Sequence, residues 1–222
     1  MVMHAREIPE CVQAISKLEI PKVWFRAMNE KQLEVSVPRF IEQTNFDNYI
    51  MLSDDTIPTQ KALDEVRKWL AVYPVVSGWC LCDPKYDRSN VLLKPSPGRA
   101  LSLPLVKQLP LLGAGGGRVN SILKLRAYVP YSLVMHQPVI FPGYYMGFFF
   151  TGLRRRLWQR FPFQTYGSRY NSLPTGSDFI LSEKLRMARI PMMIARDAYV
   201  HHLHTMRGLL IGKETPSVRF EL

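Results

Sequence analysis

Hydrophobic and polar positions along the chain alternate between two periods, and this alternation predicts a succession of helices and strands. Apolar residues recur at helical spacing over residues 9–18 and, most clearly, over residues 59–73. Compact apolar runs over residues 22–28, 49–53 and 75–82 are typical of buried strands. Strands that alternate with helices in this way predict a layered α/β fold.

Other segments extend this pattern toward the C-terminus. Ser36, followed by Pro38, predicts the start of a helix that runs to about residue 44, because serine is a favoured N-cap and proline suits a first turn. Residues 83–117 are rich in proline and glycine and predict loops. A short buried strand is predicted over residues 190–194.

Length and composition indicate a single domain, or one domain with an appendage. The chain has 222 residues, of which 47% are hydrophobic, so it can bury a sizeable core. Its formal charge of +11 favours anionic partners, namely nucleic acid, an acidic membrane surface or phosphorylated small molecules, without choosing among them. The first residues show no secretory or transit pattern, so we expect a cytoplasmic location, with peripheral contact at a membrane surface as an open alternative.

The segment YIMLSDDTIP, residues 49–58, carries the clearest chemical signal. An apolar run ends there in two adjacent carboxylates, Asp54 and Asp55, followed by the turn residue Pro58. In open α/β sheets, ligands bind at the carboxyl ends of strands, and carboxylates at that edge suit a divalent cation that carries phosphates. The alternative is a solvated turn that caps the next helix.

Four segments in order resemble the metal-dependent nucleotide-sugar glycosyltransferases of the GT-A fold, of the family 2 type. They are YIMLSDDTIP, VVSGWCLCD, FFFTGLRRRLWQRF and TGSDFILSEKLRMARIPMMIARDAYVHH, within residues 49–204. The resemblance implies an α/β fold class: a single GT-A (Rossmann-like) domain with a central mixed, mostly parallel sheet flanked by helices. Residues 1–110 would form the nucleotide- and metal-binding half, residues 118–204 the acceptor and catalytic half, and residues 205–222 a tail or lid.

The same resemblance implies a metal site. Asp55 occupies the last acidic position of the DxD-type motif and would bind Mn²⁺ or Mg²⁺ bridging the donor's diphosphate. One of His201, His202 and His204 would supply the third protein ligand, and His202 is the preferred candidate. If the segment is extended, His204 shares a face with His202, and His201 points away. Ser53 stands where the family has its first aspartate, which removes one negative charge from the site.

The remaining implied roles concern catalysis and the donor. Asp178 falls at the position of the catalytic base, which takes the proton from an acceptor hydroxyl in an inverting displacement; its alternative role is to cap a helix. Asp54 would either hold the donor's ribose or sugar or support the metal ligands. Arg6 and Arg26 are donor-binding candidates by their location in the N-terminal strands.

The expected partners are a nucleotide-sugar donor and an acceptor glycan, glycoprotein or lipid-linked sugar. Two rival classes stay open. A basic nucleic-acid-binding protein would use the arginines of residues 154–160, with Trp158, Tyr144 and Tyr145 as stacking partners, although no known nucleic-acid-binding motif is present. A metal-dependent phosphotransferase or nuclease would use the same aspartates and histidine as the transferase.

Overall fold

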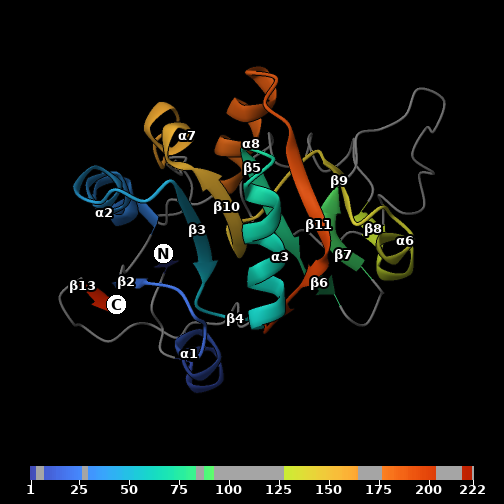
Figure 1. Ribbon diagram of the computed structural model, residues 1–222, viewed down its shortest axis with the longest axis horizontal. Helices are drawn as coiled ribbons and strands as arrows, with labels where there is room; N and C mark the ends of the chain where they lie inside the picture. The colour runs from blue at the N-terminus through green and yellow to red at the C-terminus, as the bar shows by residue number, and fades with distance from the viewer. Residues whose placement is uncertain are drawn as a thin grey trace, which may run out of the picture.

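The computed structural model describes residues 1–3, 8–26, 30–83, 88–92, 128–164, 177–203 and 217–221. These residues form an α/β fold around an eight-stranded mixed sheet, with helices on both faces (Figure 1). The strand order is β13-β2-β1-β3-β10-β5-β11-β9. The strands are β1 Val2–Met3, β2 Lys22–Arg26, β3 Asn48–Ser53, β5 Val75–Trp79, β9 Ile140–Gly143, β10 Phe150–Arg154, β11 Met192–Tyr199 and β13 Ser217–Glu221.

The expectation of a mostly parallel sheet is wrong, because four of the seven neighbouring strand pairs are antiparallel. The pairs β1–β2, β1–β3 and β5–β11 are parallel. However, β10 inserts antiparallel between β3 and β5, and the two edge strands β9 and β13 also run antiparallel to their neighbours. Strand β13 (Ser217–Glu221) lies within residues 205–222, for which the family resemblance implies a tail or lid.

Two smaller sheets lie beside the main one. Strand β4 (Thr56–Ile57) pairs with β12 (His201–His202), and β7 (Arg88–Leu92) lies between β6 (Leu81–Asp83) and β8 (Tyr128–Pro130). The prediction that residues 83–117 form only loops is therefore wrong at β7. Residues 84–87 and 93–117 of that segment lie outside the described residues.

Helices cover the two faces of the main sheet and bury separate hydrophobic clusters. One cluster includes residues of α1 (Pro9–Ser16) and α3 (Gln60–Leu70). The other includes residues of α2 (Glu30–Gln43), α7 (Arg155–Arg160) and α8 (Ser177–Met187), while the short helix α6 (Tyr131–Met135) packs in a third cluster with β7 and β8. Among the described residues, no helix combines the length and apolar character needed to cross a bilayer.

Helix α3 confirms the strongest helical pattern in the sequence. Its N-cap is Thr59, whose hydroxyl accepts a hydrogen bond from the amide of Ala62 at 3.1 Å. The helix packs closely over β10, where a Cβ added at Gly152 would lie 2.4 Å from Leu70 Cδ1. The absence of a side chain at Gly152 therefore allows α3 to lie close to the sheet.

Helix α2 begins earlier than predicted. It starts at Glu30, and Pro38 lies inside it. The Ser36 hydroxyl donates a hydrogen bond to the Gln32 carbonyl at 3.0 Å, so this serine bonds back into a helix rather than capping its start. The buried residues Leu33 and Val37 share one face of the helix, so the apolar stripe already begins before Ser36, at Leu33.

Candidate active site

Asp55 and His202, two of the predicted metal ligands, lie in contact. Strand β3 ends at Ser53, and the turn at Asp54 and Asp55 leads into β4, which pairs antiparallel with β12 so that His202 lies opposite Thr56. This pairing places His202 Nε2 3.2 Å from Asp55 Oδ1. The side chains of Asp55 and His202 are 10% and 20% exposed, so the contact is largely shielded from solvent.

The Asp55 carboxylate is also held from within its own turn. The Ser53 hydroxyl donates a hydrogen bond to Asp55 Oδ1, the same oxygen that contacts His202. The backbone carbonyl of Asp55 accepts a hydrogen bond from the amide of Leu203 at 2.9 Å. Thus Ser53, two residues before Asp55, holds the Asp55 carboxylate in position. Asp54 is only 1% exposed, and its contact with a donor stays a prediction.

This turn lies at a point where the strand order of the sheet reverses. From β1 the chain proceeds to β2 on one side and then to β3 on the other, and both strands run parallel to β1. Met3, the last residue of β1, is paired with Ser53 at the end of β3. In open α/β sheets, ligands bind in the crevice outside the carboxyl ends of strands at such a reversal.

Asp178 lies in the first turn of α8 and is anchored to the segment that joins β9 and β10. The Tyr145 hydroxyl donates a hydrogen bond to Asp178 Oδ2. The Ser182 hydroxyl lies 3.2 Å from both the amide nitrogen and the carbonyl oxygen of Met146 and so fastens the same segment to α8. Tyr145 is the site residue whose contact the sequence did not suggest, because nothing near it in sequence indicates a partner in α8.

The segment 147–149 lies close to Asp178 and contacts His202 of the Asp55–His202 pair. A Cβ added at Gly147 would lie 2.8 Å from Phe149 Cδ1 and 3.9 Å from Asp178 Oδ2. The ring of Phe149 packs edge-on against His202, with centroids 6.4 Å apart, and the Phe149 carbonyl accepts a hydrogen bond from the Ser53 amide at 3.1 Å. The segment 145–149 therefore contacts both groups of predicted site residues.

The other predicted site residues are only partly described. Arg26 ends β2, on the same edge of the sheet as Met3, and its backbone pairs with Ser217 of β13. Arg6 and His204 lie outside the described residues. Their predicted roles in donor and metal binding stay predictions.

The chemistry of Asp55 and His202 fits part of a divalent-metal site. Two ligands that bind one cation at right angles with bonds of about 2.1 Å lie about 3 Å apart, close to the observed 3.2 Å. A carboxylate and an imidazole together suit manganese better than calcium. Within the described ranges, however, no group of three or more His, Cys, Asp or Glu side chains converges as a metal site.

No known protein-family model matches this chain, and no curated protein is significantly similar to it. The glycosyltransferase resemblance therefore rests on the motifs themselves.

Proposed function

We propose that this chain is a metal-dependent glycosyltransferase that moves a sugar from a nucleotide-sugar donor to an acceptor hydroxyl with inversion. The observation that carries the proposal is the contact between Asp55 and His202, 3.2 Å apart beside the reversal of strand order. These residues belong to separate motifs of the family pattern. Their convergence at the expected edge supports the pattern as a whole, because a chance likeness gives no reason for the two motifs to meet.

Asp55 and His202 would hold Mn²⁺ or Mg²⁺, with the Ser53 hydroxyl fixing the orientation of the carboxylate. When bound, the metal supplies Lewis-acid stabilisation of the negative charge on the departing nucleoside diphosphate. The neutral Ser53 leaves the motif with less negative charge than a complete acidic set. We therefore propose weak metal binding by the protein alone and tighter binding once the donor's diphosphate contributes oxygen ligands.

Asp178 would act as the general base. The acceptor oxygen forms a bond to the anomeric carbon, the bond from that carbon to the diphosphate oxygen breaks, and the acceptor proton passes to the Asp178 carboxylate. The Tyr145 hydroxyl, which donates to Oδ2, would hold this carboxylate in position. Such a displacement at the anomeric carbon inverts its configuration.

The first test is release of nucleoside diphosphate from a panel of nucleotide sugars, with and without Mn²⁺. Asp55→Asn should abolish metal-dependent stabilisation by the donor in a thermal-shift assay, because it removes the ligand charge. Asp178→Asn should keep this stabilisation and lose turnover. Asp64→Asn, which neutralises an exposed carboxylate on α3, is the matched control and should retain both.

The products separate this proposal from the rival functions. A glycosyltransferase releases nucleoside diphosphate and a sugar, whereas a phosphotransferase or nuclease cleaves a bond to phosphorus. Release of inorganic phosphate or nucleoside monophosphate with the same dependence on Asp55 would refute sugar transfer. Equal donor stabilisation of wild type and Asp55→Asn would refute the metal site.

A further inference from the structure

A second charged feature lies at the opposite end of β3 from Asp55. The start of β3, the C-terminal end of α3 and the helix α7 enclose a cleft of about 530 Å³, which we call the arginine cleft. The lining residues include Asp47, Asn48, Ala71, Arg154, Arg155 and Arg156. Because β3 has six residues, about 17 Å of strand separates this cleft from the candidate active site.

Among the described residues that line it, the cleft carries more positive than negative charge. Arg154 Nη2 donates hydrogen bonds to the carbonyls of Ala71 and Val72, both at 3.2 Å, and Arg155 donates to the side-chain oxygen of Asn45. Both arginines thus use carbonyl partners rather than carboxylates. Arg155 Nε is buried and has no hydrogen-bond partner among the described residues. Asp47 is the one carboxylate among the lining residues, against three guanidinium groups.

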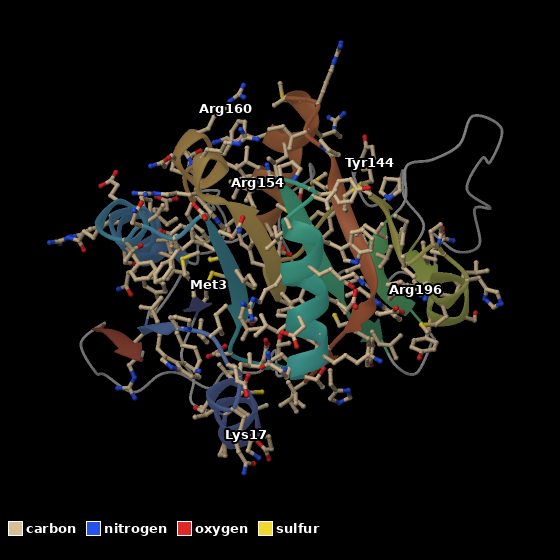
Figure 2. All side chains as sticks on the ribbon, in the orientation of Figure 1. Met3, Lys17, Tyr144, Arg154, Arg160 and Arg196 are labelled. Atoms are coloured by element: carbon tan, nitrogen blue, oxygen red, sulfur yellow. The ribbon has the colours of Figure 1, made fainter. Side chains whose placement is uncertain are left out.

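Two residues adjacent in sequence to the lining residues have exposed apolar side chains. Val72, whose carbonyl binds Arg154, is 62% exposed, and Phe46, which precedes Asp47, is 39% exposed. Figure 2 shows Arg160 near the upper edge of the molecule and Arg154 below it in the upper half, with Lys17 at the lower edge. Arginine side chains near exposed apolar side chains suit a ligand in which an anionic group lies next to an apolar part.

We propose that the arginine cleft docks the protein on the surface of a membrane that contains anionic phospholipids. The arginines bind lipid phosphates, and Val72 and Phe46 enter the boundary between headgroups and acyl chains. Free phosphate would use the arginines and leave the exposed apolar residues without a role. Single-stranded nucleic acid would need stacking surfaces, whereas Trp158, the aromatic residue within the arginine cluster, is only 2% exposed.

The test is co-sedimentation of the full chain with vesicles of phosphatidylcholine, alone or mixed with phosphatidylglycerol. Wild type should bind only the mixed vesicles, and added salt should weaken binding. Each arginine near an anionic surface contributes about a fivefold gain in partitioning. Arg156→Gln in the cleft, combined with Arg160→Gln one helical turn further along α7 and outside the cleft lining, should therefore weaken binding about 25-fold. Both side chains are exposed, so this variant should fold normally.

The matched control removes two exposed charges elsewhere, by Lys17→Gln at the C-cap of α1 combined with Lys61→Gln on α3. This control should bind mixed vesicles nearly as well as wild type, while Val72→Ser should weaken binding without changing its salt dependence. Equal loss in the lysine and arginine variants would overturn the proposal in favour of a net-charge effect. Two other results would also overturn it: stabilisation by inorganic phosphate without vesicle binding, or arginine-dependent binding of an oligonucleotide alone.

Discussion

A buried pair of hydroxyl groups lies beneath the segment that anchors Asp178 and provides a sharp test of the structure. Ser77 of β5 and Thr151 of β10 are 1% and 0% exposed, and their hydroxyl oxygens lie 2.7 Å apart. Thr151 donates to the carbonyl of Gly147, which leaves the Ser77 hydroxyl two acceptors, the Thr151 oxygen and the carbonyl of Gly78 at 2.8 Å. This chain of hydrogen bonds connects the central strands to the segment that holds Tyr145.

Replacing Thr151 by valine keeps the shape of the side chain and removes both hydrogen bonds. Leaving a buried polar group without a partner costs about 1–3 kcal/mol. Ser77 can redirect its proton to the carbonyl of Gly78, 2.8 Å away, so the cost falls mainly on Gly147. We therefore expect Thr151→Val to lower the free energy of unfolding by about 2 kcal/mol, which for a domain of this size lowers Tm by about 4–8 °C.

The assay is urea denaturation of a double-mutant cycle. Ser77→Ala removes a donor but leaves the bond from Thr151 to Gly147, so it should cost only about 1 kcal/mol. The double variant should be more stable than the sum of the two single effects predicts, by about 1 kcal/mol, with an unchanged dependence on urea concentration. Strictly additive effects, or a Thr151→Val variant as stable as wild type, would refute the hydrogen-bond chain.

Three further predictions concern single contacts. Gly78→Ala should lower the free energy of unfolding by about 1–3 kcal/mol in urea, because the added Cβ would lie 2.5 Å from the backbone oxygen of Ala198 and force β5 and β11 apart; an unchanged midpoint would contradict this. Thr59→Ala should cost about 1 kcal/mol in the same assay, whereas Thr59→Asn keeps an N-cap acceptor and should cost less; equal losses would rule out the capping role. The Arg196 guanidinium donates to Asp197 and lowers the pKa of that carboxyl below its ordinary value of 3.8. This stabilisation is present above pH 3.8 and is lost as the pH falls through the lowered pKa, so the stability difference between wild type and Arg196→Gln should shrink in acid; a difference independent of pH would disprove the coupling.

The N-terminal half of the fold could be predicted largely from local patterns. Helix α3 combines a capping threonine with an uninterrupted apolar stripe, so propensity and packing favour the same structure. The start of α2 is wrong in the prediction, because Ser36 and Pro38 resemble a helix start. Burial of Leu33 against the sheet favours a helix that begins before them. The direction of β10 carries no local signal, because a strand's sequence shows which residues are buried and not which neighbour it pairs with.

The candidate site shows the same division between local and long-range information. The sequence indicated Asp55 and His202 individually, because an acidic strand end and a histidine cluster are visible within a few residues. Their contact depends on the pairing of β4 with β12, which no local pattern encodes. The hydrogen bond from Tyr145 to Asp178 is likewise a product of tertiary packing. Motifs could therefore name candidate residues, but not the groups that orient them.

The antiparallel insertion of β10 has a consequence for synthesis of the protein on the ribosome. Both sheet neighbours of β5, namely β10 and β11, follow it in the chain, and β10 ends roughly 75 residues after β5. Translation proceeds at roughly 5–20 residues per second, so β5 has no partner in the main sheet for about 4–15 s after it is synthesised. During that interval its backbone hydrogen-bonding groups are open to strands of other nascent chains. The speed of translation through residues 80–154 should therefore influence how much of the protein folds and how much aggregates.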